Sequence, residues 1–532
     1  MENAVIKSVL YYNGKILTMD EQDTITEAVL TIGERIAAVG KTADLMRQKL
    51  PDTQLVDLAG KTLMPGLIDG HVHLEMATTD MVLGRSASTP PCESLADILE
   101  VIKKAAAETP PGEWVVVRGT LGYDKKIRDQ RGLTRRDIDA VVDSRPVAFF
   151  PAIHVCVLNT KGIERMGWWQ EKDIPVNATL GRDPETGELT GVYCEAWGSG
   201  SPLSPWPYET RKEAMYEGTM EYFVKLGITS AYEIPYSFDG IRAWQDLKRE
   251  GRMPLRVTMY PPDLFLLHGA KDFLQYGLTR GFGDDWVRIG GMKFFADGIG
   301  LHANGYPIKC LHYTQEELNE LVYRSHAAGM QIWTHAMSEE AFEQTLLAYE
   351  NALARLPKED HRMQIEHSGD VIGKFSRQQE YLRRMLDAGI GAMMTPTFQH
   401  FGVYYDKDDA LHTRSLIDMG FKLRGNSDTT GSSKLTVNPW FAMWCAVTRK
   451  NYWGQVINPA ERITVMEALK MYTVWAALGA FEEKIKGSIE PGKLADLIIL
   501  RDDPLTCEVD ALKDMVVETV VIGGDVRCRT PL

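Results

Sequence analysis

The chain has 532 residues, of which 44% are hydrophobic and 25% are charged. This composition excludes a disordered or collagen-like chain, and the length corresponds to about three to four domain equivalents, or to one large barrel with a smaller domain. The net charge of −14 argues against a nucleic-acid-binding surface and against adhesion to anionic membranes.

The start of the chain lacks a basic segment followed by a long apolar stretch, and no run of 18 uninterrupted apolar residues occurs in the sequence. We therefore expect a cytoplasmic location and no membrane partner. The seven cysteines are scattered and form no C-x-x-C pair, which predicts free thiols in a reducing compartment.

Both ends of the chain contain short β-branched runs broken by glycine and aspartate, in residues 11–40 and 487–524. These runs are typical of meandering strands. They predict a small β-sandwich domain composed of residues 1–64 and 479–532.

Between the two ends, short apolar runs alternate with helical patterns, which indicates βα units. Eight strands are expected, at residues 67–74, 229–234, 255–260, 291–296, 331–335, 363–367, 390–395 and 423–427. The predicted fold class is therefore α/β, with a (β/α)8 TIM-like barrel over residues 65–478 and an active site at the carboxyl ends of its strands.

Helix boundaries have local signals as well. Capping boxes are expected at four pairs, Thr210 with Glu213, Thr314 with Glu317, Ser376 with Gln379 and Thr464 with Glu467. Helix ends are expected near Gly227, Gly329 and Gly389.

About 150 residues separate the first two expected barrel strands, which is too long for an ordinary βα loop. We expect an inserted lobe at about residues 79–207. Within it, residues 94–107 predict a helix with Leu95, Ile98, Leu99 and Ile102 on one face.

Residues suited to metal binding recur where barrel strands should end. His71 and His73 are two positions apart, so in a strand their imidazoles point to the same side. His335, His367 and Asp428 end three later strands. Lys293 lies inside an apolar strand, where an ammonium needs a partner or a function; an ion pair with Asp297 or Glu195 is the structural alternative.

Four segments carry a family resemblance, at residues 64–73 (MPGLIDGHVH), 183–192 (DPETGELTGV), 293–298 (KFFADG) and 490–497 (EPGKLADL). Through them the chain resembles the amidohydrolase superfamily of metal-dependent hydrolases, in particular the amidohydrolase-3 or YtcJ-like branch, which includes N-substituted formamide deformylases. The resemblance covers nearly the whole chain.

The resemblance implies a centre of two divalent ions, with zinc expected first and Mn, Fe, Co or Ni also compatible with such ligands. His71, His73 and Asp428 would hold the more buried ion. His335 and His367 would hold the second ion. A CO2-derived carbamate on Lys293 would bridge both, with Glu195 as the alternative bridging carboxylate.

Substrate contacts are less clearly marked. His154 and Asn159 match a branch motif on the inserted lobe, where His154 is either a substrate contact or a structural histidine. The candidate substrate-binding residues are His154, Glu195, Trp333, His302 and Phe398. Residues 231–233 (AYE) and 299–301 (IGL) depart from the branch pattern and would reshape the pocket.

The predicted function is hydrolysis of an amide C–N bond in a small hydrophobic or aromatic N-acyl compound, with Asp428 as acid and base beside a metal-activated hydroxide. The sequence has no G-x-S-x-G elbow, Walker A loop or G-x-G-x-x-G motif. Deamination, decarboxylation or ester hydrolysis on the same scaffold remain alternatives, although Lys293 argues against a mononuclear deaminase. A non-enzymatic binding protein is a further alternative. The expected partner is a small-molecule substrate, and association into a homo-oligomer stays open.

Overall fold

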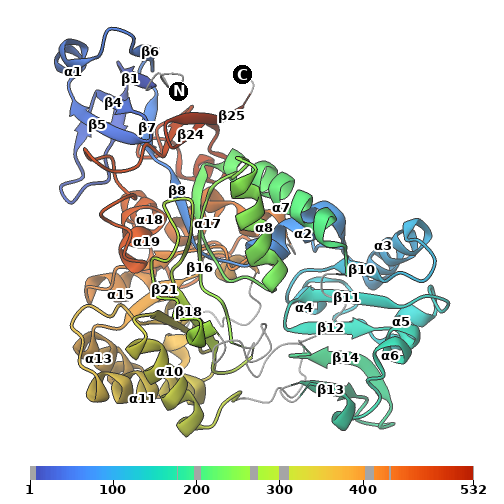
Figure 1. Cartoon of the computed structure of the whole chain (residues 1–532). Coiled ribbons are helices and arrows are strands. Elements are labelled where there is room, and N and C mark those ends of the chain that lie inside the picture. The colour runs from blue at the N-terminus through green and yellow to red at the C-terminus, as the bar shows by residue number, and fades with distance from the viewer. Residues whose placement is uncertain are drawn as a thin grey trace.

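The computed structural model describes residues 7–175, 178–196, 205–263, 273–298, 311–401, 412–430 and 433–530. It is an α/β structure with three regions that are distinct in Figure 1: sheets formed by the chain ends, a central region of parallel strands and helices, and a lobe formed by residues 85–194.

Strands from both ends of the chain pair with one another. One sheet has the order β5-β4-β1-β6 and a second the order β25-β24-β23-β7-β2-β3. The strands are β1 (Ser8–Tyr12), β2 (Lys15–Leu17), β3 (Ile25–Thr26), β4 (Ala28–Ile32), β5 (Arg35–Gly40), β6 (Gln54–Asp57), β7 (Thr62–Pro65), β23 (Leu497–Leu500), β24 (Val517–Ile522) and β25 (Asp525–Arg529); helix α1 (Thr42–Gln48) lies between β5 and β6. Apolar residues of the two sheets, including Val9, Ile16, Leu63 and Leu497, form one buried cluster.

The central strands form two parallel sheets, with orders β17-β16-β15-β8 and β18-β19-β20-β21-β22. Their bounds are β8 (Leu67–Val72), β15 (Ile228–Glu233), β16 (Arg256–Met259), β17 (Val287–Ile289), β18 (Gly291–Phe295), β19 (Gln331–His335), β20 (Gln364–Glu366), β21 (Gly391–Met394) and β22 (Arg424–Gly425). A strand lies at each of the eight expected positions, and β17 is additional. The first strand ends at Val72, because helix α2 begins at Leu74 with His73 as its N-cap residue.

Backbone hydrogen bonds join the two parallel sheets at both edges. Beyond β22, the Asp428 N–H donates to the His71 carbonyl at 2.9 Å. On the other side, the Lys293 N–H donates to the Pro261 carbonyl at 3.2 Å, and the Asp263 N–H donates to the Lys293 carbonyl at 3.1 Å. The carboxyl ends of strands from both sheets therefore lie close together.

Helices flank the parallel strands (Figure 1). They are α2 (Leu74–Leu83), α7 (Tyr208–Tyr222), α8 (Phe238–Arg249), α10 (Gln315–Ala327), α11 (Glu339–Arg355), α12 (Ser368–Val371), α13 (Gln378–Ala388), α14 (Phe398–Phe401), α15 (Thr413–Asp418), α16 (Lys434–Val437), α17 (Pro439–Thr448), α18 (Val465–Met471) and α19 (Val474–Gly479). The capping boxes at Thr314 and Thr464 are confirmed. Gly227 and Gly389 are C-cap residues in the left-handed region, and Gly329, with φ 77°, follows the C-cap residue Ala328.

Two of the expected capping boxes are wrong. Helix α7 begins at Tyr208, so Thr210 lies inside its first turn rather than before it. Helix α13 begins after Arg377, and the hydroxyl and backbone N–H of Ser376 donate to Glu339 instead. A tertiary hydrogen bond thus replaces the local cap that the sequence pattern indicated.

The lobe contains a mixed sheet of order β13-β14-β12-β11-β10-β9. Its elements are β9 (Arg85–Ser86), α3 (Leu95–Glu108), β10 (Val115–Arg118), α4 (Tyr123–Lys126), α5 (Arg135–Asp139), β11 (Val147–Ala152), β12 (Val155–Leu158), α6 (Thr160–Met166), β13 (Thr179–Arg182) and β14 (Leu189–Cys194). The helix expected at residues 94–107 is confirmed as α3: Ser94 caps it, and Leu95, Ile98 and Ile102 are buried. A buried ion pair between Arg118 and Asp80, with Nε and Oδ2 2.8 Å apart, connects β10 to α2.

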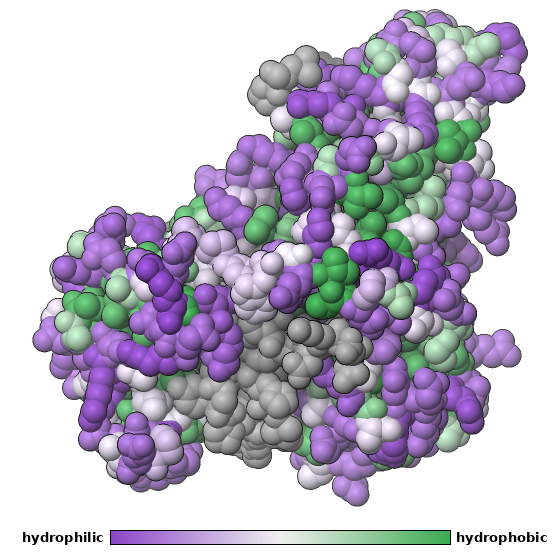
Figure 2. All heavy atoms as spheres, turned by 180° about the vertical axis from the view of Figure 1, so that it is seen from behind, coloured by the Kyte–Doolittle hydropathy of each residue, from purple (hydrophilic) through white to green (hydrophobic). Residues whose placement is uncertain are grey.

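Hydrophilic residues cover most of the face in Figure 2, and hydrophobic side chains gather between the terminal sheets and the rest of the molecule. Among the described residues, no helix is both long and apolar enough to cross a membrane. Six of the cysteines are free thiols, as expected, and Cys310 lies outside the described residues.

We expect the Asp496→Asn substitution to lower the stability of the fold. Arg256 of β16 is buried, and its Nε lies 2.7 Å from Oδ2 of Asp496, which precedes β23. Without the Asp496 charge, Arg256 keeps only Glu34 as an ion-pair partner among the described residues, at 3.6 Å and half-exposed, and breaking a buried pair costs about 3–5 kcal/mol. Urea unfolding followed by circular dichroism should show a clearly lower midpoint. The Lys7→Met control removes an exposed pair with Asp525 and should cost less than about 1 kcal/mol; equal shifts for both variants would contradict the argument.

Candidate metal centre

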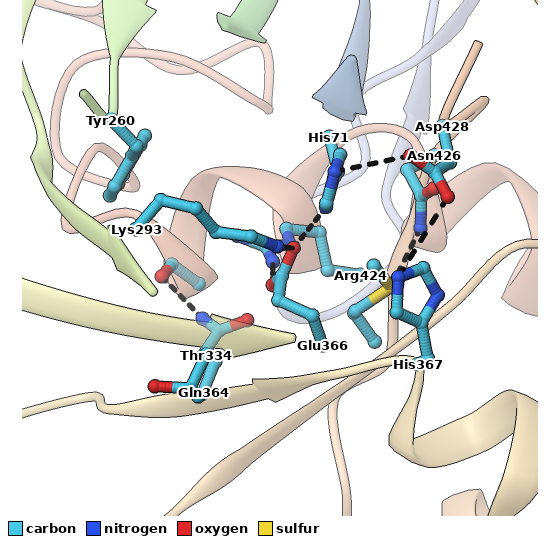
Figure 3. A network of polar contacts seen from close by, with 12 residues as sticks. His71, Tyr260, Lys293, Thr334, Gln364, Glu366, His367, Arg424, Asn426 and Asp428 are labelled. Atoms are coloured by element: carbon cyan, nitrogen blue, oxygen red, sulfur yellow. Dashed lines mark hydrogen bonds and ion pairs between the residues drawn. The ribbon is translucent and has the colours of Figure 1, made fainter. Parts of the chain in front are cut away.

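Candidate metal-binding side chains lie at the carboxyl ends of the parallel strands, and Figure 3 shows four of them: His71, Lys293, His367 and Asp428. His71 lies in β8 and His73 directly follows that strand. Lys293 lies in β18, His335 ends β19, His367 follows β20, and Asp428 follows β22. Residues far apart in the sequence are therefore brought together by strand order alone.

His71, His73 and Asp428 form the tightest group. The Oδ1 atom of Asp428 lies 3.2 Å from His71 Nε2 and 3.5 Å from His73 Nε2. One potential ligand atom from each residue lies within 4.8 Å of the others. Burial lowers the pKa of His73 to about 4, so this imidazole is neutral at pH 7, as metal binding requires. Two imidazoles and a carboxylate are donors that suit a divalent transition metal, so this group fits the implied ion.

His335 and His367 lie on the other side of Asp428. Their ring centroids are 4.7 Å apart, and His367 Nε2 lies 3.8 Å from Asp428 Oδ2. The two oxygens of Asp428 therefore face different histidines. His367 Nδ1 contacts Asp370 Oδ2 at 3.3 Å, whereas His335 Nε2 donates to the Gly298 carbonyl at 2.9 Å. His335 thus lies beside His367 rather than in direct contact with Asp428.

Lys293 is fully buried, and its carboxylate neighbour is Glu366, with Nζ 3.3 Å from Oε2. The expected ion pair of Lys293 with Asp297 or Glu195 is therefore wrong. Asp297 instead accepts hydrogen bonds from the backbone of Met337 and Ser338, and Glu195 contacts His154. Burial lowers the pKa of Lys293, and the charge of Glu366 opposes this shift.

Three residues of this region have strained backbone conformations. His367, Asp428 and Glu195 adopt positive φ angles of 65°, 44° and 53°. Non-glycine residues rarely adopt this region, and such strain persists where the surrounding structure holds it, commonly at functional sites. The strain is thus independent support for a functional role of this region.

The lobe contributes a second histidine–carboxylate contact. His154 Nδ1 lies 3.0 Å and 3.1 Å from the two carboxylate oxygens of Glu195, and the His154 ring centroid is 5.7 Å from that of His335. A Cβ atom at Gly298 would overlap the Glu195 carboxylate, so glycine permits this close approach. The lobe therefore extends to the edge of the histidine cluster.

The remaining candidate residues lie in different surroundings. The ring of Phe398 stacks on His367, with centroids 5.9 Å apart. Trp333 is fully buried and stacks on Tyr260 at 3.4 Å. His302 lies outside the described residues.

Glu366 and Arg424 form an ion pair and are both fully buried, and neither was among the residues expected at the site. A signal was available, because Glu366 and Arg424 are charged residues inside expected barrel strands, as Lys293 is. Both residues lie just before a candidate metal ligand, His367 or Asp428, and only the ligands were considered.

The chain resembles known proteins along most of its length. The sequence model of the Amidohydrolase family matches residues 54–527. The chain is 27% identical to the N-substituted formamide deformylase of Arthrobacter pascens, over 98% of each chain, and 25% identical to the putative amidohydrolase YtcJ of Bacillus subtilis, over 97% and 98%. The structure resembles that of an uncharacterized metal-dependent hydrolase from Pyrococcus furiosus with a TM-score of 0.68, at 22% identity over 94% of this chain and 100% of the other.

We expect His73→Asn and Asp428→Asn each to weaken zinc binding by at least about 100-fold. Each variant removes one donor of the tightest group, so the loss should exceed the 10–100-fold that loss of a ligand's hydrogen-bonding partner costs. Competition with a chromophoric chelator measures the dissociation constant. The matched control is His326→Asn, because His326 is a buried histidine of α10 whose Nε2 donates to the Leu356 carbonyl. Unchanged affinity in the two test variants would refute the assignment.

Proposed function

The chain belongs to the Amidohydrolase family, a family of metal-dependent hydrolases, and we propose on this premise that it hydrolyses an amide C–N bond in a small N-acyl or amide compound. The observation that carries the proposal is the group of His71, His73 and Asp428, where two imidazoles and a carboxylate converge at strand ends. A hydrolytic metal site requires imidazole and carboxylate ligands, and a barrel places its active site at the carboxyl ends of its strands.

We propose that the eight expected strands form a closed (β/α)8 barrel. The hydrogen bonds between Asp428 and His71, and between Lys293 and the backbone after β16, support closure because each connects the two parallel sheets. On this proposal, residues 65–478 form the barrel domain, residues 79–207 include its inserted lobe, and residues 1–64 with 479–532 form the composite β-sandwich domain.

The proposed centre holds two divalent ions, with zinc expected first. His71, His73 and Asp428 would hold one ion, and His335 with His367 would hold the other. A carbamate on Lys293 would bridge them: the amine nitrogen forms a bond to the carbon of CO2 and releases a proton. The full burial of Lys293 supports this role, since a carbamate would convert a buried cation into an anionic ligand.

When bound, the ions would supply an acidified water and polarise the substrate carbonyl. The residues of the chain would then move the proton. An oxygen of the Asp428 carboxylate accepts a proton from the attacking water and donates it to the departing nitrogen, so that the products are a carboxylic acid and an amine. The Asp428 carboxylate lies 3.2 Å from His71 Nε2 and 3.8 Å from His367 Nε2, so it would stand beside the ions that these histidines hold.

The substrate would lie between the histidine cluster and the lobe. His154, whose Nδ1–H donates to Glu195, would present Nε2 to accept a hydrogen bond from a substrate N–H, and Phe398 presents an aromatic ring beside His367. The relative from Arthrobacter pascens is named for N-substituted formamides, so this compound class is the first to test.

The first experiment counts metal ions per chain by elemental mass spectrometry on protein purified without chelators. We expect about two ions, and release of amine from a panel of N-substituted formamides and N-acyl amines. One ion would contradict the bridged pair, and no ion with no hydrolysis after addition of zinc and bicarbonate would refute the proposed function.

Asp428→Asn should lower kcat by about 10²–10⁴-fold, because it removes the group that transfers the proton. Amine release under substrate saturation measures this, with metal supplied at a concentration that saturates the variant. The control is Asp525→Asn. Asp525 is exposed, forms an ion pair with Lys7, and is distant in sequence from the residues of the centre. A variant with full metal occupancy and unchanged kcat would exclude Asp428 as the acid and base.

A further inference from the structure

Glu366 is a fully buried carboxylate that contacts three nitrogen-bearing side chains (Figure 3). Its Oε2 atom contacts His71 Nδ1 and lies 3.3 Å from Lys293 Nζ. Its Oε1 atom contacts Arg424 Nη2. The carboxylate is therefore enclosed by three side chains whose nitrogens can donate to it.

Because of the contact with Glu366, the two ring nitrogens of His71 face different groups. Nδ1 faces Glu366, while Nε2 lies 3.2 Å from Asp428, on the side of the proposed metal. An imidazole that donates its Nδ1–H to a carboxylate has a free electron pair on Nε2, which is the atom a metal requires. Glu366 therefore selects both the orientation and the tautomer suited to binding.

Arg424 holds Glu366 from the opposite side. Its guanidinium carbon lies 3.5 Å from the ring centroid of Trp333, which stacks on Tyr260 with an angle of 15° between the rings. A Cβ atom at Gly70 would overlap the Arg424 side chain, so the glycine beside His71 makes room for it. The carboxylate is thus fixed by a rigid aromatic stack outside the ligand group.

The charges next to Glu366 show that this carboxylate does not need the contact with His71 for its own stability. Arg424 is a fully buried cation that pairs with Glu366 whether or not Lys293 carries a carbamate, so the charge of Glu366 is compensated without a proton from His71. The imidazole, in contrast, has no other carboxylate at Nδ1 among its described contacts. The main effect of the contact is therefore to fix the position of the His71 ring, rather than to stabilise Glu366.

We propose that Glu366 is a positioning residue of the metal centre and that Arg424 fixes it in place. Glu366 orients His71 toward the ion and does not itself touch substrate or bind the metal. This inference rests on the proposed metal centre, and it assigns roles to two residues that lie outside the ligand set.

The test compares zinc affinity and the visible spectrum of the cobalt-substituted protein. Glu366→Gln should weaken zinc binding by about 10–100-fold and change the cobalt absorption bands, because the orientation of a ligand is altered. The matched control is Glu482→Gln. Glu482 is a buried carboxylate that lies 2.6 Å from Lys486 and accepts a hydrogen bond from Thr258, so its loss should affect folding without changing affinity or spectrum.

A second pair of variants tests the role of Arg424 and covers the case in which Glu366→Gln does not fold. Arg424→Met should weaken zinc binding and alter the cobalt spectrum in the same direction, by a smaller factor. Its control is Arg256→Met, since Arg256 is equally buried, pairs with Asp496 and lies over the ring of Trp286.

The outcomes separate this inference from the proposed function. Wild-type affinity and an unchanged cobalt spectrum in Glu366→Gln, or in Arg424→Met where only that variant folds, would overturn the positioning role. Absence of metal binding in the wild-type protein would instead refute the metal centre itself.

Discussion

Asp428 joins the last parallel strand to the first, and the candidate centre depends on this contact. Its backbone N–H donates to the His71 carbonyl at 2.9 Å, and its carboxylate lies 3.2 Å from the His71 ring. One residue thus connects the edges of two sheets and brings together histidines from both. Because its φ angle is 44°, the chain turns sharply after β22, and the carboxylate is directed to the strand ends.

Charge compensation is the second constraint on this region. Lys293, Glu366 and Arg424 are all fully buried, which would be costly for any of them alone. While Lys293 is an unmodified ammonium, the three together leave one excess positive charge next to the negative charge of Asp428. The centre therefore contains a set of buried ion pairs beside a group of metal ligands. Binding of a cation would change the net charge of that ligand group.

Much of the fold could be predicted from the sequence, because strand positions depend on local apolar runs and on chain order. Each of the eight expected strands is present, and His71, His73 and Asp428 could be grouped because parallel strands end at one edge. The partner of Lys293 could not be predicted in this way. Glu366 of β20 reaches Lys293 of β18 across the intervening strand β19, and hydrophobic periodicity does not specify such a contact. The caps at Thr210 and Ser376 were wrong for a related reason, since the fold set the helix starts there.

The pairing of β7 with β23 has a consequence for synthesis of the chain. Strand β7 ends at Pro65 and its partner β23 begins at Leu497, with Met64 opposite Ile498 in the register. At about 5–20 residues per second, a ribosome needs roughly 20–90 s to make the intervening segment. During this interval β7 can pair with β2 but lacks β23 on its other side, and an unpaired strand edge is a site of aggregation. Nascent chains of this protein should therefore depend on chaperone protection until the final strands emerge.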